Sequence, residues 1–194
     1  MPVRQLVLAS TSTYRRMLLE RLRLPFTCVA PEVDETPLPQ EEPQSMALRL
    51  ASAKARAGAE KFPAALIVGS DQVAVAAGTI LGKPGSREAA TQQLRLTRGA
   101  SALFHTALCL LDAPSGSART AVVTTRVRYR DYSDAQIARY LERDEPWQCA
   151  GSARLEALGI TLIERLEGED PTALIGLPLI ALTTMLNAEG IEVP

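Results

Sequence analysis

The stretch Leu66-Ile67-Val68-Gly69-Ser70-Asp71-Gln72 joins an apolar run to a short polar segment that carries one carboxylate. A short apolar run bounded by glycine is typical of a buried strand, and the polar residues predict its end. In open α/β sheets, ligands bind outside the carboxyl ends of strands. An acid at that position can bind a divalent metal or take a proton from water. Asp71 is therefore the first candidate for a catalytic residue.

Strands and helices alternate on both sides of this stretch. Apolar or alternating runs predict strands at 5–9, 26–30, 103–111, 121–129 and 159–166, and a hairpin within 73–81. Capping and stop signals predict helices at about 13–23, 45–60, 86–96 and 133–142, and a closing helix from Pro178 that Gly190 ends. Ser133 and Gln136 have the spacing of a capping box. We therefore expect an α/β fold with a mixed central sheet and flanking helices.

Composition and charge exclude several classes of protein. The chain has 194 residues, of which 46% are hydrophobic, and a net charge of -1. This composition excludes a disordered chain and gives no basic face for nucleic acid. No apolar run reaches about 18 residues, and residues 1–5 show no signal-peptide pattern. We expect one cytoplasmic domain over residues 1–194, without a membrane or nucleic-acid partner. The sequence leaves a homodimer open.

Cysteine and histidine offer little chemistry. Cys28, Cys109 and Cys149 are far apart and form no Cys-x-x-Cys pair, which argues against a zinc ribbon and a disulfide framework. We expect three reduced thiols in or near the core. His105, the one histidine of the sequence, lies in an apolar run and is expected to be structural. The chemistry must therefore rest on carboxylates, Arg, Lys and hydroxyl groups.

Several basic residues are candidates for binding phosphate. Ser10 follows the first strand, and Arg15 lies in the first turn of the next helix, whose N-terminus can bind an anion. Arg16 is the less certain of the arginine pair. Lys54 lies on an apolar helix face, and Lys83 lies in a Gly-Lys-Pro turn where the backbone can approach a ligand. Solvated arginines and a lysine whose stem packs on apolar surface would explain the same pattern without a ligand.

A second source of carboxylates is the proline-rich, acidic segment 31–43, in which Asp34 and Glu35 are adjacent. We expect this segment to be a loop. Two acids from different loops, together with Arg and two Lys, describe a site for a metal-bound triphosphate.

Eight blocks of the sequence, in this order, resemble the Maf-like nucleotide pyrophosphatases. They lie between residue 8 and about residue 186 and are L-A-S-T-S-x-x-R-R, P-E-V-D-E-T-P, R-L-A-x-x-K-A, G-S-D-Q-V, G-K-P, C-A-G-S-x-x-x-E, G-I-T-L-x-E-R-L-E-G and G-L-P-L-I-A-L. The resemblance implies a two-lobed Maf/ITPase-like fold around a substrate cleft. It also implies a house-cleaning hydrolase that uses a divalent cation (Mg²⁺ or Mn²⁺) to convert a nucleoside triphosphate to the monophosphate and diphosphate.

Two blocks are similar to the branch of the family that hydrolyses 7-methyl-GTP, namely Gly-Ser-Asp-Gln and Cys-Ala-Gly-Ser. The sister branch, which cleaves dTTP and UTP, usually has Ala-Asp-Thr at Ser70-Asp71-Gln72 and a Gln near Glu156. That specificity is one alternative. A nucleotide-binding regulator of septum formation without essential turnover is the other. Gln72 and Glu156 argue against the first, and the presence of Asp71 with Lys54 and Lys83 favours an active enzyme.

The resemblance also implies roles for individual residues. The catalytic proton acceptor would be Asp71, and the base-selecting residues would be Tyr14, Gln72 and Glu156. A carboxylate at Glu156 can accept both donors of the guanine edge, and Tyr14 can stack on a cationic methylated base. The phosphates would be bound by Ser10, Arg15, Lys54 and Lys83. The metal would be held by Glu35 and Asp71, with Asp34 as a substitute.

One departure from the family pattern lies at the start of the first helix. Many relatives have Ser-Pro followed by an aromatic residue or Arg, whereas this chain has Ser12-Thr13-Tyr14. Loss of the proline removes a residue favoured at the first helical position. The aromatic residue is kept, so stacking on the base remains expected.

Overall fold

The computed structural model describes residues 4–194; residues 1–3, part of the stretch without a signal-peptide pattern, lie outside the described residues. The strands are β1 (Leu6–Ala9), β2 (Phe26–Val29), β3 (Leu66–Ala76), β4 (Thr79–Leu81), β5 (Ser101–Asp112), β6 (Ala118–Tyr129) and β7 (Ile163–Glu167). The α-helices are α1 (Thr13–Glu20), α2 (Pro43–Lys61), α3 (Arg87–Thr97), α4 (Asp134–Asp144) and α5 (Leu179–Ala188). Short 3₁₀ helices are η1 (Ala150–Ser152), η2 (Leu158–Leu162) and η3 (Ala173–Ile175).

The strands form one mixed sheet in the order β2-β1-β3-β5-β6-β7, with β4 beside β3. The pairs of β1 with β2 and with β3 are parallel, whereas β3 with β4 and β6 with β7 are antiparallel. This arrangement confirms the predicted α/β class with a mixed sheet.

The chain folds into two compact units. Unit 1 holds the described residues up to Asp71, together with Thr106–Val123 and Asp170–Pro194. Unit 2 holds Gln72–His105 and Thr124–Glu169. The chain passes from one unit to the other within β3, β5 and β6, and a fourth time between Glu169 and Asp170, after β7. The single domain over residues 1–194 stays a prediction.

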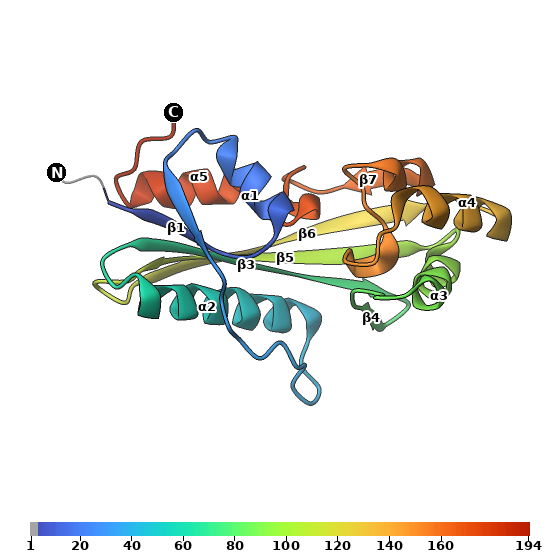
Figure 1. Ribbon diagram of the computed structural model, residues 1–194, viewed down its shortest axis with the longest axis horizontal. Coiled ribbons are helices and arrows are strands. Elements are labelled where there is room, and N and C mark those ends of the chain that lie inside the picture. Colours follow the sequence, from blue (N-terminus) through green and yellow to red (C-terminus); the bar gives the residue numbers. More distant parts are fainter. Residues whose placement is uncertain (1–3) are drawn as a thin grey trace. The chain divides into compact units, whose positions relative to one another are not determined.

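In unit 1, helices cover both faces of the sheet: α1 and α5 lie on one face and α2 on the other (Figure 1). The α1–α5 face buries a leucine-rich core that includes Leu8, Leu18, Leu110 and Leu182. On the α2 face, glycine brings helix and strand into close approach. A Cβ atom on Gly69 of β3 would lie 2.2 Å from the carbonyl oxygen of Ala51 and 2.7 Å from the nitrogen of Ala55.

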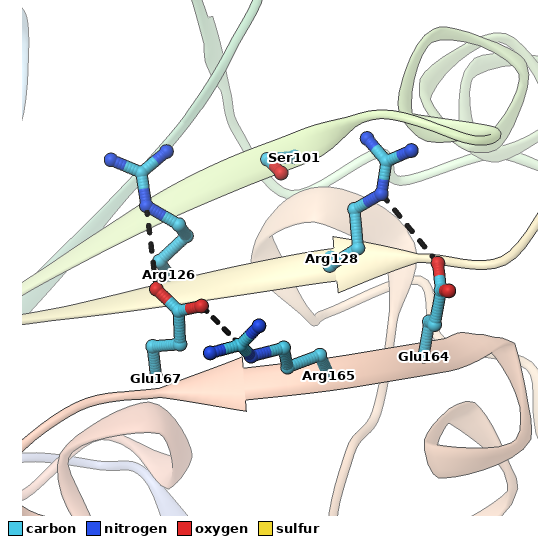
Figure 2. A pocket seen from close by; sticks show the side chains of 6 residues that line it. All are labelled: Ser101, Arg126, Arg128, Glu164, Arg165 and Glu167. Carbon is cyan, nitrogen blue, oxygen red and sulfur yellow. Dashed lines mark ion pairs between the residues drawn. The ribbon is translucent and has the colours of Figure 1, made fainter.

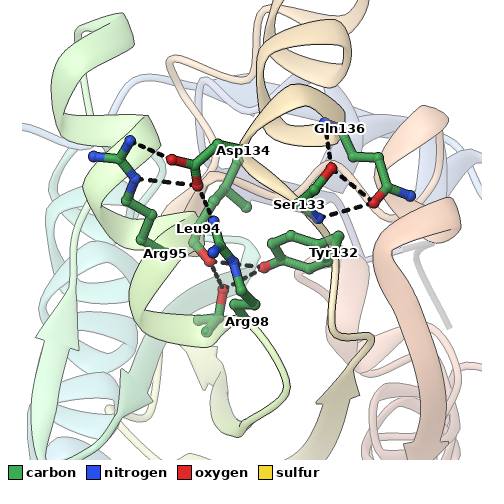
Figure 3. Close-up of polar contacts among 8 residues, drawn as sticks. Leu94, Arg95, Arg98, Tyr132, Ser133, Asp134 and Gln136 are labelled. Atoms are coloured by element: carbon green, nitrogen blue, oxygen red, sulfur yellow. Dashed lines mark hydrogen bonds and ion pairs between the residues drawn. The ribbon is translucent and has the colours of Figure 1, made fainter.

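In unit 2, charged and hydroxyl side chains hold α3 against the start of α4 (Figure 3). Asp134 forms ion pairs with Arg95, at 2.7 Å, and with Arg98. The Tyr132 hydroxyl donates to the Leu94 carbonyl at 2.9 Å. The capping box predicted at Ser133 and Gln136 is confirmed.

A second polar region of unit 2 lies on β6 and β7, where a hollow of about 470 Å³ is lined by Ser101 and five charged residues (Figure 2). Arg165 lies 2.9 Å from Glu167, and Arg128 lies 3.6 Å from Glu164. These side chains are about half exposed or more. Such a face is the solvated side expected of an antiparallel sheet, and exposed pairs of this kind contribute little stability.

Several element boundaries differ from the predictions. β3 does not end in the polar segment 69–72 but runs to Ala76, because residues 74–76 pair with β4. The segment 159–166 is not a single strand. Its first half is the 3₁₀ helix η2, in which Gly159 lies against the backbone of Arg154, and β7 begins only at Ile163. Helix α1 ends at Glu20, three residues early, and α2 begins two residues early at Pro43.

The thiols and the histidine lie in different environments. All three cysteines are free, but Cys28 is exposed, which contradicts its expected place in or near the core; Cys109 is buried and Cys149 is half-buried. His105 is buried, and its Nδ1 lies 2.9 Å from the Thr124 hydroxyl. Burial lowers the pKa of His105 and so favours the neutral ring. Among the described residues, none of the helices has the length and apolar character needed to span a bilayer.

Candidate active site

Asp71 lies inside β3, two residues beyond the point where the parallel pairing with β1 ends at Ala9 and Gly69. Gly69 and Asp71 point to the same face of the sheet because side chains alternate along a strand. That face is covered by α2, on which Ala51, Lys54 and Ala55 share a side. The close approach at Gly69 therefore carries Lys54 to Asp71, with Nζ 2.6 Å from Oδ1. The two side chains are 7% and 11% exposed.

Glu35 brings a second carboxylate to the same lysine. Its Oε1 lies 2.5 Å from Lys54 Nζ, although the Glu35 side chain is 54% exposed. The neighbouring Asp34 has a different role. Its Oδ1 accepts from the backbone nitrogen of Thr36 at 2.9 Å. Hydrogen bonding to the Thr36 side chain, and secondly to this backbone nitrogen, lowers the Asp34 pKa. The structure thus brings Glu35, Lys54 and Asp71 together and leaves Asp34 to stabilise the loop.

Arg49 of α2 holds the loop that carries Glu35, a role the sequence analysis missed. Its guanidinium binds both carboxylate oxygens of Glu41, at 2.6 and 2.8 Å, and donates to the Thr36 carbonyl at 3.1 Å. The Glu41 hydrogen bonds raise the Arg49 pKa, with a smaller contribution from the charge of Asp71. The signal was present, because Arg49 opens the R-L-A-x-x-K-A block.

Arg15 and Ser10 lie where β1 leads into α1. Arg15 is half-buried, and its Nε donates to the carbonyl of Gly176 at 2.8 Å. The same carbonyl accepts from the Ser70 hydroxyl at 2.9 Å. Burial lowers the pKa of Arg15, and the charges of Asp71 and Glu35 oppose this shift. Arg15 is therefore electrostatically coupled to both acids.

Other candidates at this helix start are placed as follows. Ser10 is buried, and its Oγ accepts from the backbone nitrogen of Ser12 at 3.1 Å. Ser12 caps α1 by accepting from the nitrogen of Arg15. Arg16, the less certain arginine, pairs with Glu20 at 3.0 Å on the exposed side of α1. Tyr14 is half-buried, and its contact with a base stays a prediction.

The remaining candidates belong to unit 2. Gln72, next to Asp71 in β3, is half-buried, and both Lys83 and Glu156 are exposed. Burial and the Glu156 charge raise the pKa of Cys149 to about 11, and Lys83 is among the cations that oppose this shift. Lys83 and Glu156 thus act on the same thiol. Although Glu156 is exposed, partial desolvation by its surroundings raises its carboxyl pKa, with a smaller contribution from Asp144.

The acids of unit 1 can be tested as ligands for a divalent cation. Within residues 4–194, no three His, Cys, Asp or Glu side chains gather as a metal site. Glu35 and Asp71, however, converge on one cation, the Lys54 ammonium. Mg²⁺ is usually held by one or two carboxylates, with substrate phosphates and water completing its ligands. The two carboxylates therefore fit a metal that binds together with a phosphorylated substrate.

Comparisons with known proteins show which family the sequence matches. The sequence profile described as "Maf-like protein" matches residues 5–189. A protein of Aromatoleum aromaticum named 7-methyl-GTP pyrophosphatase is 57% identical over 98% of both chains. Proteins of the same name from Nitrosospira multiformis and Cupriavidus pinatubonensis are 55% and 54% identical. Each match covers 97% of this chain, and 96% and 95% of those relatives.

Proposed function

The chain belongs to the family of Maf-like proteins, and we propose that it hydrolyses 7-methyl-GTP to 7-methyl-GMP and diphosphate. The observation that carries the proposal is the convergence of Glu35 and Asp71 on Lys54, in a chain whose near-full-length relatives are named 7-methyl-GTP pyrophosphatase. The convergence of the side chains supports the hydrolytic reaction, and the names of the relatives support the substrate.

In this proposal Asp71 acts on the attacking water. The carboxylate orients the water and takes its proton while the oxygen attacks the α-phosphorus of the substrate. Negative charge then develops on the leaving diphosphate. Lys54 and Arg15 both lie close to Asp71, and therefore close to the reacting phosphate in this proposal. Their positive charges stabilise the charge on the leaving group. Ser10 and Lys83 are proposed to bind further phosphate oxygens.

A divalent cation, Mg²⁺ or Mn²⁺, is part of the proposal. Glu35 and Asp71 would hold it, and Arg49 fixes the loop that supplies Glu35. When bound, such an ion neutralises charge on the triphosphate. The proposed compartment is the cytoplasm, and the free state of all three cysteines agrees with a reducing environment.

Selection of the base is assigned to Tyr14, Gln72 and Glu156. The N1–H and amino group of guanine are both donors, and a carboxylate accepts from both. Methylation at N7 makes the base cationic, which favours stacking on the face of an aromatic ring such as Tyr14.

The test is a panel of nucleoside triphosphates, including 7-methyl-GTP, GTP, dTTP and UTP, incubated with Mg²⁺ or Mn²⁺. Products are separated by chromatography. We expect 7-methyl-GMP and diphosphate, with 7-methyl-GTP the preferred substrate. Production of 7-methyl-GDP and phosphate would contradict the reaction. Preference for UTP or dTTP would assign the sister specificity, and nucleotide binding without turnover would favour a regulatory protein.

A further inference from the structure

Glu35 and Asp71, the two candidate metal ligands, both form an ion pair with the ammonium group of Lys54. Lys54 Nζ lies 2.5 Å from Glu35 and 2.6 Å from Asp71, and its side chain is 7% exposed. The ammonium therefore occupies the space between the two carboxylates. A metal ion bound by the same two oxygens would need that space, since Mg²⁺ lies about 2.0–2.1 Å from its oxygen ligands.

Displacing Lys54 from this position requires another anion. A buried ammonium that loses its carboxylates is costly unless new oxygens replace them. A lysine can make such a move because its charge sits on a flexible four-carbon stem, whereas its Cα is fixed in α2. Arg15 adds a further positive charge close to both acids. In the free protein, the position for a divalent cation is therefore occupied by the Lys54 ammonium, and the charge of Arg15 also repels an entering cation.

We infer that Lys54 blocks the cation position of Glu35 and Asp71 in the free protein and moves to the triphosphate when nucleotide binds. The inference rests on the proposed function, because the triphosphate supplies the oxygens that receive the ammonium. Lys54 thus makes binding of the divalent cation depend on nucleotide. By thermodynamic linkage, the cation strengthens nucleotide binding by the same factor.

The first experiment measures Mn²⁺ binding to the full chain without nucleotide, from the electron paramagnetic resonance signal of free Mn²⁺. Lys54→Met keeps the length of the side chain but removes its charge. This variant should bind Mn²⁺ roughly tenfold tighter than the parent, within the 5–150-fold range usual for coupled sites. The matched control is Lys61→Met, which removes the charge of an exposed lysine on the same helix. It should bind Mn²⁺ like the parent.

The second experiment uses the parent protein and so does not depend on the folding of a variant. Mn²⁺ binding is measured with and without a 7-methyl-GTP analogue that carries a methylene group between the α- and β-phosphorus atoms. Binding of Mn²⁺ to the free analogue is measured separately. The parent should bind Mn²⁺ markedly tighter with the analogue, and Lys54→Met should gain less.

The outcomes separate this inference from the proposed function. Equal or weaker Mn²⁺ binding by Lys54→Met, with circular dichroism unchanged, would overturn the inference. Mn²⁺ binding by the parent that is as tight without the analogue as with it would do the same. Failure of the analogue to bind the parent would count against the proposed substrate, while the metal-only experiment would still decide the role of Lys54.

Discussion

Replacement of Asp71 by Asn should separate the catalytic role of this residue from its structural role. Asn keeps the shape of the side chain but removes the proton acceptor and one negative charge. Loss of a general base lowers the rate by about 10²–10⁴. Nucleotide binding measured without a divalent cation should persist, because Lys54 and Arg15 remain and a carboxylate that repels phosphate is gone.

The structural cost of the same change follows from the Lys54 contacts. Asp71→Asn weakens a 2.6 Å ion pair, but Glu35 still lies 2.5 Å from the ammonium. We therefore expect a loss of about 1.5–3 kcal/mol in the free energy of unfolding, the range for a hydrogen bond to a charged group. In a chain of this length, each kcal/mol lowers the melting temperature by about 2–4 °C. The variant should remain folded at 25 °C.

The assay compares kcat on 7-methyl-GTP, nucleotide binding and thermal unfolding for the parent and for Asp71→Asn. Glu20→Gln is the control, because it also removes one carboxylate from an ion pair in unit 1, on the exposed side of α1. Turnover by Asp71→Asn within threefold of the parent would refute the assignment of Asp71 as the base. A rate loss that only matched the unfolded fraction would make Asp71 a structural residue.

Three further changes test specificity and packing. Tyr14→Ala should narrow the ratio of kcat/KM for 7-methyl-GTP over GTP, since stacking on a cationic base contributes about 0.5–2 kcal/mol; an unchanged ratio would exclude stacking there. Glu156→Gln should lower kcat/KM on both guanine nucleotides together, by about 1–3 kcal/mol for donors left unpaired. The raised pKa of Glu156 means that its ionised form is disfavoured in the fold, so its contribution to stability is present at low pH and lost as pH rises through the folded pKa. Glu156→Gln should thus leave the melting temperature at pH 7 unchanged or higher, and a clear decrease would contradict this. Gly69→Ala should destabilise the protein by about 1–3 kcal/mol through overpacking and slow catalysis by moving α2. Gly82→Ala, where an added Cβ meets no atom within 4 Å, should leave the stability unchanged. Equal effects of the two substitutions on stability would refute the close approach at Gly69.

The sequence identified Asp71 and Lys54 as site residues but not their contact. The two are 17 positions apart, and their meeting depends on how closely α2 approaches β3 at Gly69. A glycine in an apolar run looks the same whether it ends a strand or lets a helix approach. The composition of Gly69-Ser70-Asp71-Gln72 is that of a turn. Pairing of residues 74–76 with β4 overrides that local preference.

The choice between Asp34 and Glu35 shows another limit of the sequence. Both are acids in one loop, and composition gives no reason to prefer either. The path of the loop decides, and that path is set by the contact of Arg49 with Glu41, eight positions along the chain. The alternation of strands and helices, by contrast, follows from local patterns, so the fold class was predictable.

The division of each unit among separate stretches of the chain has a consequence for inheritance. Unit 1 is assembled from three stretches and unit 2 from two, with crossings inside β3, β5 and β6 and a fourth after β7. No single cut of the polypeptide releases either unit whole, and no single exchange of gene segments can transplant one into another protein. The set of Glu35, Lys54 and Asp71 in unit 1 is therefore inherited together with Glu156 in unit 2. The proposed base-selecting residues therefore change by point substitution within unit 2 or α1, rather than by recombination of modules.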